Sequence, residues 1–249
     1  MLTYAYRNPA YESAYDLPAR DVPPDKVFFV ATTPRSGSTL LAFLCRQSGA
    51  LGFPLEYFTE INARLIRQRL SLENCGFPAY VEALTRIRTS SNGVFSFKLH
   101  NEELSAFLAQ GGCDIAFMSR AKAILLERED KLSQATSLVI ASQTNQWIDL
   151  PGYHMSGKQQ PKYDRKAIED AMTSLTRQHD GWRAFLANTG IPTLELSYES
   201  IVGNCPTAFQ RICDFVAIPS VTPSLQSVEL RRQDSEVNHD WRRRFLSGR

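Results

Sequence analysis

The chain has 249 residues, a formal net charge of +2, and 43% hydrophobic and 22% charged residues. This length allows one large core, and we expect a single domain over residues 1–249. The small net charge argues against a general nucleic-acid partner. Residues 1–25 are rich in Tyr and Pro and lack the apolar core of a signal peptide, and no segment approaches the ~20 apolar residues of a membrane span. We therefore expect a cytoplasmic protein whose N-terminal arm, residues 1–25, lies over its own domain or a partner's.

From residue 27 to residue 112 the sequence alternates between strand and helix patterns. Residues 27–31 are β-branched and aromatic, which predicts a buried strand. After a short polar loop the spacing of apolar residues becomes helical. The other elements predicted here are a helix at 39–50, a connector at 51–60, helices at 61–70 and 78–89, a strand at 92–100 and a helix at 101–112.

The C-terminal half continues the alternation. The polar segment 148–164 is long for a connection, so we interpret it as a lid or an acceptor-binding loop. The basic cluster "WRRRF" at 241–245 is interpreted as the solvated face of a helix. The other predicted elements are a strand at 123–127, a helix at 130–147, a long amphipathic helix at 165–190, a strand at 192–198 and a helix at 205–218.

This alternation predicts the α/β class, with a P-loop-like parallel sheet flanked by helices on both faces. Ligands in such sheets bind at the carboxyl ends of the strands. Five scattered cysteines show neither zinc nor redox spacing, so we predict no metal site and interpret them as reduced, packed thiols: Cys45, Cys75, Cys113, Cys205 and Cys213.

The polar loop "TTPRSGST" connects the first strand to the next helix. Free N–H groups and the positive end of the helix dipole make such a turn an anion site. Compared with the nucleotide triphosphatase pattern G-x-x-x-x-G-K-[ST], Gly37 and Thr39 match, but Thr32 replaces the first Gly and Ser38 replaces the Lys. The loop therefore suits an anionic group held by amides and by the forked donor Arg35, and it disfavours ATP hydrolysis. An ordinary capped helix after a strand is the alternative.

A second anion feature lies in "REDKLSQATS", where Arg128 closes a strand and Ser137 follows on the next helix. A guanidinium and a hydroxyl from adjacent elements can hold one phosphate. The alternative is an Arg128 paired with Glu129 or Asp130. Two such sites together indicate a nucleotide with phosphates at both its 5′ and 3′ ends.

These motifs resemble those of the bacterial trehalose 2-sulfotransferase family. "TPRSGSTLL" is similar to the 5′-phosphosulfate loop of sulfotransferases and "REDKLSQATS" to their 3′-phosphate motif. The segments "SGALGFPLEYF", "FKLH", "SQTNQW" and "DGWRAFLANTGI" follow in the family's order, so the resemblance spans residues 28–241. It implies the donor 3′-phosphoadenosine-5′-phosphosulfate (PAPS) and no metal. The implied donor-binding residues are Arg35, Ser36, Gly37, Ser38, Thr39, Arg128 and Ser137. Arg231 and Arg232, in "RRQDSE", are further candidates for closing over the donor, and a solvated pair is the alternative.

The resemblance also implies a general base at Glu56, in "PLEYF". Transfer to a sugar hydroxyl requires removal of a proton whose pKa lies far above 7, and a carboxylate on a connector after the donor loop can reach it. His100 is the rival base. The expected acceptor-binding residues are Tyr57, Lys98, Gln143 and Thr144. For Lys98 the alternatives are a cation that offsets charge on the leaving phosphosulfate oxygen and a solvated lysine. Trp147 suits either a sugar face or the core, with the core slightly favoured, and Trp182 is predicted to be core.

The sequence thus predicts a PAPS-dependent sulfotransferase that moves a sulfuryl group in line to a carbohydrate hydroxyl. Trehalose, a lipopolysaccharide sugar, another glycan and a glycolipid are all compatible acceptors. Family resemblance suggests a homodimer, and no nucleic acid is expected as a partner. The alternatives are a P-loop kinase acting on a small molecule and a non-catalytic nucleotide-binding protein.

Overall fold

The computed structural model describes residues 8–115, 118–150, 160–231, 233 and 235–248. Its four strands form one sheet in the order β2-β1-β3-β4, and every pairing is parallel. The predicted α/β class is therefore confirmed. The strands are β1 (Lys26–Thr32), β2 (Val94–His100), β3 (Lys122–Glu127) and β4 (Thr193–Ser197).

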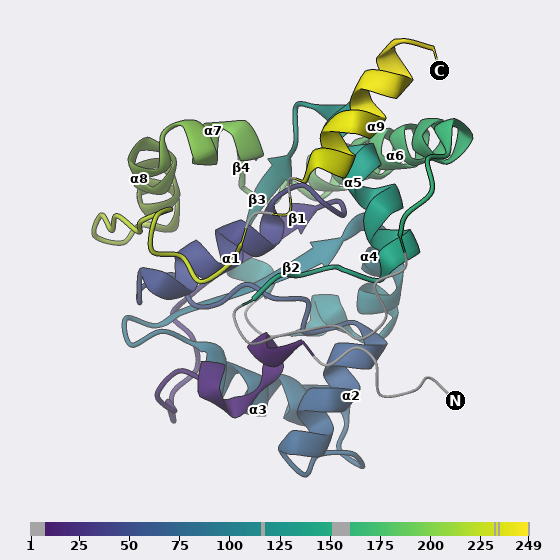
Figure 1. Cartoon of the computed structure of the whole chain (residues 1–249). Helices are drawn as coiled ribbons and strands as arrows, with labels where there is room; N and C mark the ends of the chain where they lie inside the picture. The colour runs from purple at the N-terminus through teal and green to yellow at the C-terminus, as the bar shows by residue number, and fades with distance from the viewer. Residues whose placement is uncertain (1–7, 116–117, 151–159, 232, 234, 249) are drawn as a thin grey trace.

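Helices cover both faces of the sheet (Figure 1). Strand β1 lies between β2 and β3, so the connections that follow β1 and β2 run in opposite directions across the sheet. Open α/β sheets bind ligands at such a switch point. The helices are α1 (Ser38–Gln47), α2 (Glu60–Arg69), α3 (Phe77–Arg88), α4 (Asn101–Ala109), α5 (Lys131–Thr144), α6 (Arg165–Thr189), α7 (Tyr198–Gly203), α8 (Cys205–Val216) and α9 (Glu236–Leu246).

The alternation of side chains along β1 divides the core into two layers. Phe28 and Val30 pack with buried residues of α1 and α8. Val27 and Phe29 point the other way, into a layer that includes residues of α3 and α6. The predicted core residue Trp182 of α6 belongs to this second layer; it is fully buried, and its indole N–H donates to the carbonyl of Thr32 at 2.7 Å.

Several elements differ from the sequence predictions in extent or in surroundings. Helix α5 ends at Thr144, before the predicted residue 147, because Asn145 adopts a left-handed conformation with φ 56°. Strand β4 ends at Ser197, whose side chain caps the short helix α7, an element that the sequence pattern did not indicate. Helix α9 packs on α5 through the buried Trp241, so the "WRRRF" cluster is only partly solvated.

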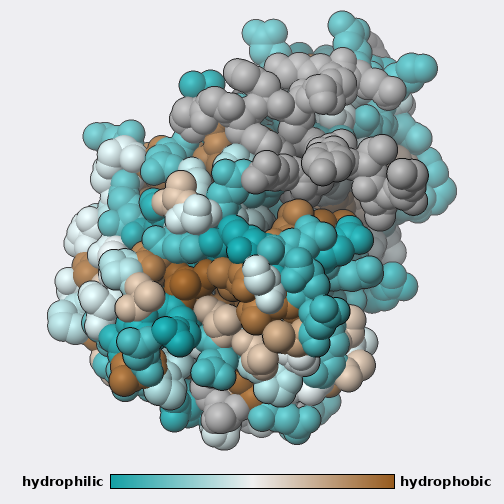
Figure 2. Space-filling view, turned by 90° about the horizontal axis from the view of Figure 1, so that it is seen from below, coloured by the Kyte–Doolittle hydropathy of each residue, from teal (hydrophilic) through white to brown (hydrophobic). Residues whose placement is uncertain are grey.

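Figure 2 shows the side of the molecule that carries α2 and α3. Apolar side chains gather in the middle of this face, and hydrophilic ones surround them (Figure 2). None of the helices in the described part of the chain combines the length and the apolar character that crossing a bilayer requires.

The described part of the N-terminal arm, residues 8–25, packs on its own domain, one of the two predicted positions. Two short 3-10 turns, η1 (Pro9–Tyr11) and η2 (Ser13–Tyr15), lie against α2 and α3. Ala10 and Tyr11 belong to the core layer that contains Phe29. The arm is therefore a structural part of the domain.

A buried arginine at the end of α3 holds the arm in place. Arg88 is fully buried, and its guanidinium donates to the carbonyls of Ala10 and Tyr15 at 3.1 and 3.2 Å. It also pairs with Asp16 at 2.9 Å, and Arg69 of α2 binds the same carboxylate. A guanidinium removed from water needs acceptors for its donors, and here the arm supplies them for both terminal nitrogens.

We expect Arg88→Met to destabilise the fold by about 3 kcal/mol, because it leaves carbonyls of the arm without their donor and leaves Asp16 with Arg69 alone. For a chain of this length that corresponds to a fall in Tm of roughly 10 °C, measured by calorimetry. Arg86→Met on the same helix is the control, because its pair with Asp21 is largely exposed and contributes at most about 1 kcal/mol. Equal Tm values for the two variants would contradict the anchoring role.

Candidate active site

The loop after β1 positions the start of α1 as an anion site. Gly37 is the N-cap of α1, with φ 87° and no side-chain cap, so the first amides of the helix lack an internal acceptor. A Cβ at Gly37 would lie 2.3 Å from the ring of Tyr198, so only glycine fits against that ring. The predicted loop geometry is therefore present, with Ser38 and Thr39 in the first turn of the helix.

Two side chains of this loop have roles other than the expected ones. The side chain of Ser36 is buried, and its hydroxyl shares a hydrogen bond with the hydroxyl of Thr32. This hydroxyl is therefore engaged inside the protein, which leaves the backbone of Ser36 as the part that can bind a ligand. The guanidinium of Arg35 donates to Ser137 Oγ at 2.9 Å and to the carbonyl of Trp147 at 2.8 Å. It also donates to Gln233, so Arg35 braces the loop against two other segments.

A cavity of about 400 Å³ lies beside this loop and includes the second predicted anion feature. Arg128 and Ser137 both line it, with Arg128 stacked over Tyr198 at 5.0 Å and donating to the carbonyl of Arg35 at 3.5 Å. The Nε of Arg128 is buried and has no partner among the described residues, and the same holds for Arg242 of α9. Guanidinium groups in the wall of a cavity are typical of a site for an anionic ligand.

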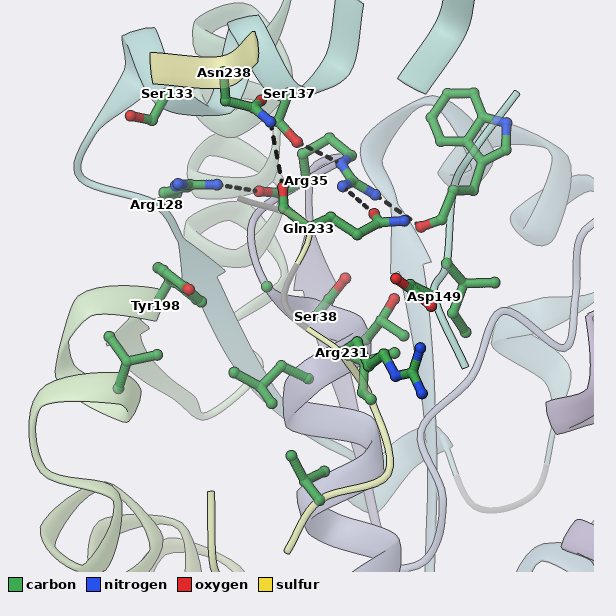
Figure 3. A pocket seen from close by; sticks show the side chains of 18 of the residues that line it. Arg35, Ser38, Arg128, Ser133, Ser137, Asp149, Tyr198, Arg231, Gln233 and Asn238 are labelled. Atoms are coloured by element: carbon green, nitrogen blue, oxygen red, sulfur yellow. Dashed lines mark hydrogen bonds between the residues drawn. The ribbon is translucent and has the colours of Figure 1, made fainter. Parts of the chain in front are cut away.

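The charge of the cavity supports the same conclusion. Its described lining contains Arg35, Arg128, Arg231 and Arg242 but only one carboxylate, Asp149. Figure 3 shows Arg35, Arg128, Arg231 and Asp149 around the loop, with Ser133, Ser137 and Asn238 along one side. Arg242 pairs with Asp130, which lies outside the cavity lining, at 3.2 Å. The excess of guanidinium groups suits a ligand with more than one phosphate-like group.

A second cavity, of about 1240 Å³, lies on the other side of the loop. It extends between α2, the N-terminal arm and α6, and Glu56, Lys98 and His100 are among its lining residues. The two cavities share five lining residues, so a ligand in one can contact a ligand in the other: Arg35, Ser38, Thr39, Trp147 and Ile148.

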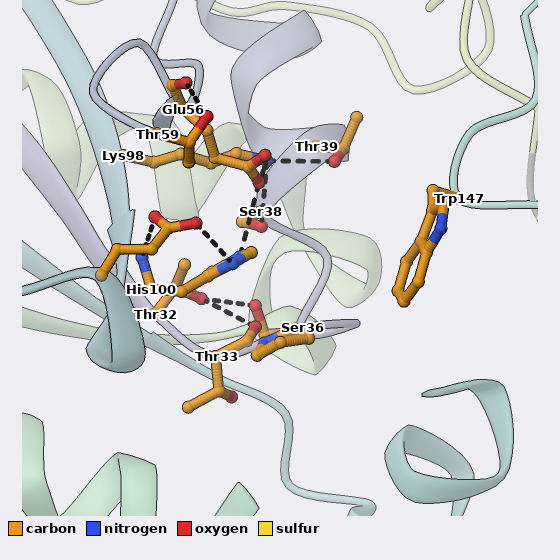
Figure 4. Close-up of polar contacts among 12 residues, drawn as sticks. Thr32, Thr33, Ser36, Ser38, Thr39, Glu56, Thr59, Lys98, His100 and Trp147 are labelled. Atoms are coloured by element: carbon orange, nitrogen blue, oxygen red, sulfur yellow. Dashed lines mark hydrogen bonds and ion pairs between the residues drawn. The ribbon is translucent and has the colours of Figure 1, made fainter. Parts of the chain in front are cut away.

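A cluster of ionisable groups lies in the second cavity where it meets the loop (Figure 4). Lys98 is 3% exposed, and its ammonium lies 3.0 Å from Glu56 Oε1. The same ammonium donates to Thr39 Oγ1 at 3.2 Å and to Ser38 Oγ at 3.5 Å. His100 Nε2 lies 3.5 Å from Glu56. Because it is buried, Lys98 is not a solvated lysine. Its ammonium connects the predicted base Glu56 to the loop after β1.

The protonation states in this cluster follow from burial and from Lys98. Burial raises the pKa of Glu56, but it is outweighed by the charge of Lys98, then by that of His100 in its protonated form, and by the hydrogen bond from Lys98. The net pKa of Glu56 therefore lies below the usual value. Burial lowers the pKa of His100 to about 4, although Glu56 raises it. His100 is thus neutral at pH 7, and Lys98 is the charge that keeps Glu56 ionised there.

A second carboxylate completes the cluster. Glu103 accepts the backbone N–H of His100 at 3.1 Å, and its Oε1 lies 3.7 Å from His100 Nδ1. Burial, followed by the charge of Glu56, raises the pKa of Glu103 to about 7. A neutral imidazole between two carboxyl groups can accept a proton and pass it on, so the cluster can take a proton from a hydroxyl.

Several predicted site residues lie elsewhere. The ring of Tyr57 is fully buried, and its hydroxyl donates to the carbonyl of Phe53. Gln143 bonds to the backbone of Lys162, and Thr144 donates to the carbonyl of Ile140. None of these three predicted acceptor-binding residues is in the described lining of either cavity. Arg232 lies outside the described residues.

Trp147 is half-buried and not part of a helix, and it lines both cavities, whereas the sequence slightly favoured a core position. Sequence reasoning also missed residues of the C-terminal segment that line or support the cavity containing Arg128 and Ser137. Gln233 holds Arg35, and Asn238 and Arg242 come from α9. Two signals were present in this segment. In the "WRRRF" cluster a buried Trp241 precedes Arg242, and in "RRQDSE" Arg231 lines the cavity.

The chain belongs to the Stf0 sulphotransferase family, whose model matches residues 27–247. It is therefore a sulfotransferase. Two trehalose 2-sulfotransferases are similar along their length. The protein of Mycobacterium tuberculosis (strain ATCC 35801 / TMC 107 / Erdman) is 27% identical, and the match covers 88% of this chain and 93% of that protein. The protein of Mycolicibacterium smegmatis (strain ATCC 700084 / mc(2)155) is 23% identical with the same coverage.

Solved structures show a looser likeness. The sulfotransferase domain of the Synechococcus PCC 7002 olefin synthase is 17% identical, with a TM-score of 0.48 and 90% of each chain covered. Mouse sulfotransferase SULT7A1, crystallised with PAP, is 15% identical, with a TM-score of 0.45 and with 90% of this chain and 66% of that one covered.

We expect Lys98→Met to move the titration of Glu56 to higher pH, because burial then acts on the carboxyl without the opposing ammonium. The titration is measured by NMR of the side-chain carboxyl carbon, assigned with Glu56→Gln. Lys166→Met is the control, because Lys166 is paired with Asp170 on an exposed part of α6. An unchanged titration of Glu56 in Lys98→Met would show that another charge keeps it ionised.

Proposed function

We propose that this protein transfers a sulfuryl group from PAPS to a carbohydrate hydroxyl, with Glu56 as the general base. One observation carries the proposal: the arginine-lined cavity and the large cavity meet at Ser38 and Thr39, with Glu56 only on the large-cavity side. The donor therefore belongs in the first cavity and the acceptor in the second.

The first cavity fits a donor with anionic groups at two ends. The uncapped amides of α1 would hold the 5′-phosphosulfate, as the loop comparison predicts. Arg128 and Ser137 would hold the 3′-phosphate, and the positive charge of Arg242 in the same cavity lining supports an anion there. A volume of about 400 Å³ is within the range of small-molecule sites.

The second cavity supplies the groups for an in-line transfer. Glu56 takes the hydroxyl proton while the acceptor oxygen forms a bond to sulfur, and the bond between sulfur and the bridging phosphate oxygen breaks. Lys98 and the amides of α1 are placed to stabilise the charge that develops on that departing oxygen. Neutral His100 lies beside Glu56 and remains the rival base.

The names of the two curated relatives support trehalose as the acceptor. The second cavity is larger than the usual upper range of about 1,000 Å³ for small-molecule sites, which also allows a larger glycan or a glycolipid. Incubating the protein with isotope-labelled donor, trehalose and a panel of cell-envelope glycans, followed by mass spectrometry, identifies the acceptor.

A cytoplasmic location is part of the proposal. Cys45, Cys75, Cys205 and Cys213 are free thiols, and all of these except Cys75 are buried. Reduced thiols are usual in the cytosol, where glutathione and thioredoxin maintain them.

Calorimetry with 3′,5′-adenosine bisphosphate tests the donor site. We expect Arg128→Gln to weaken its binding by about 10- to 100-fold, because a hydrogen bond to a charged group contributes roughly 1.5–3 kcal/mol. Adenosine 5′-phosphate should bind both forms equally, since it lacks the 3′ group. Arg183→Gln is the control, because Arg183 pairs with Glu195 on the surface. Tight binding of ATP with magnesium instead of the bisphosphate would favour a kinase.

Transfer kinetics test the base. We expect Glu56→Gln to lower kcat by about 100-fold or more, the usual effect of general base catalysis, and to leave bisphosphate binding unchanged. His100→Gln should have the smaller effect, because Glu56 carries the charge. The reverse order would assign the base to His100, and binding without turnover in the wild type would favour a non-catalytic nucleotide-binding protein.

A further inference from the structure

The N-terminal arm precedes residue 27, where the family model begins, yet it touches the connector that carries Glu56. We propose that Tyr11 is a positioning residue that fixes the backbone of Glu56, so that the arm is a working part of the acceptor site. The inference rests on the proposed role of Glu56 as the base.

The hydroxyl of Tyr11 is bonded to the connector and to α2. It accepts the backbone N–H of Glu56 at 3.1 Å and the side-chain amide of Asn62 at 3.0 Å. The same amide of Asn62 donates to the carbonyl of Glu56 at 2.8 Å. Tyr11 and Asn62 are 5% and 4% exposed, so water does not replace these bonds readily. The backbone N–H of Glu56 is therefore bonded to a side chain of the arm, and its carbonyl to a side chain of α2.

Glu56 needs such support because its connector has little regular structure. Leu55 forms an isolated bridge with Phe97, and α2 does not begin until Glu60. Between these points the N–H of Glu56 is satisfied by a side chain and not by a strand. The carboxylate must stay within 3.0 Å of Lys98 and close to a bound hydroxyl, and loss of such alignment reduces proton transfer.

Tyr11 is itself held firmly. Its ring packs edge-on against Tyr57, with centroids 6.1 Å apart, and Asn8 caps its turn. The buried Arg88 binds the carbonyl of the preceding residue, Ala10. Arg88 also lies 5.6 Å from the ring of Tyr57, so one guanidinium connects the arm with the segment that carries Glu56.

Tyr11 also lines the acceptor cavity, together with Asn8 and Glu12 of the same arm. No residue of the arm is in the described lining of the donor cavity. A change at the Tyr11 hydroxyl should therefore affect the chemical step and leave donor binding intact. If the tyrosine served only to fill the core, its ring alone would suffice.

Tyr11→Phe separates these possibilities, because it keeps the ring and removes the hydroxyl. We expect kcat for sulfuryl transfer to fall by about tenfold, with the KM for the donor and the affinity for 3′,5′-adenosine bisphosphate unchanged. Tyr15→Phe is the matched control, since Tyr15 is in the same arm but its hydroxyl bonds to the exposed Glu229. It should retain the wild-type kcat.

The Glu56→Gln background shows whether the hydroxyl acts through Glu56. Tyr11→Phe should cause no further loss of kcat there, whereas independent effects would multiply. Asn62→Leu removes the other bond to the Glu56 backbone and should cause a similar loss of kcat. If Tyr11→Phe does not fold, this variant serves as the test of whether the bonds to the Glu56 backbone matter for the chemical step. An unchanged kcat in Tyr11→Phe, or a full tenfold loss in the Glu56→Gln background, would overturn the proposal.

Failure of this inference is distinguishable from failure of the proposed function. Absence of sulfuryl transfer by the wild type contradicts the function itself, and a wild-type kcat in Glu56→Gln contradicts the base. A loss of kcat in Glu56→Gln, with a wild-type kcat in Tyr11→Phe, contradicts only the role of the arm.

Discussion

The active site depends on the ammonium of Lys98, which is removed from water between a carboxylate and two hydroxyls. It lies 3.0 Å from Glu56 and within 3.5 Å of both Ser38 and Thr39. The donor loop has a serine where a nucleotide triphosphatase has its lysine, and β2 brings this cation to the same turn through space. The pairing keeps Glu56 ionised despite burial and places it beside the loop.

The sheet makes this arrangement possible through its register. Lys98 pairs with Val30 of β1, so its side chain leaves β2 near the start of the donor loop. Arg128 follows β3 on the other side of β1, and Tyr198 follows β4. Lys98 and Arg128 thus come from strands on either side of β1, and the two cavities that they line share the loop after β1 as a wall.

The periphery supports the site as much as the sheet does. The arm, α2 and α3 are joined by the buried Arg88, and α9 brings Arg242 to the donor cavity. These contacts join residues that are far apart in sequence, such as Arg88 with Ala10 and Arg35 with Gln233. Buried polar groups of this kind stabilise one arrangement of the segments around the reacting groups.

The sequence alone determined the alternation of strands and helices and the anion-binding turn. The spacing of apolar residues and the glycine at the start of α1 are local features, so they can be recognised within a few residues of the chain. It also indicated Arg128 and Ser137, which the structure brings together at one cavity. Only the tertiary structure decided that Lys98 is buried, that Tyr57 and Thr144 point away from the cavities, and that Tyr11 holds Glu56. Those facts depend on contacts between side chains that are far apart in sequence, and such contacts leave no local pattern in the chain.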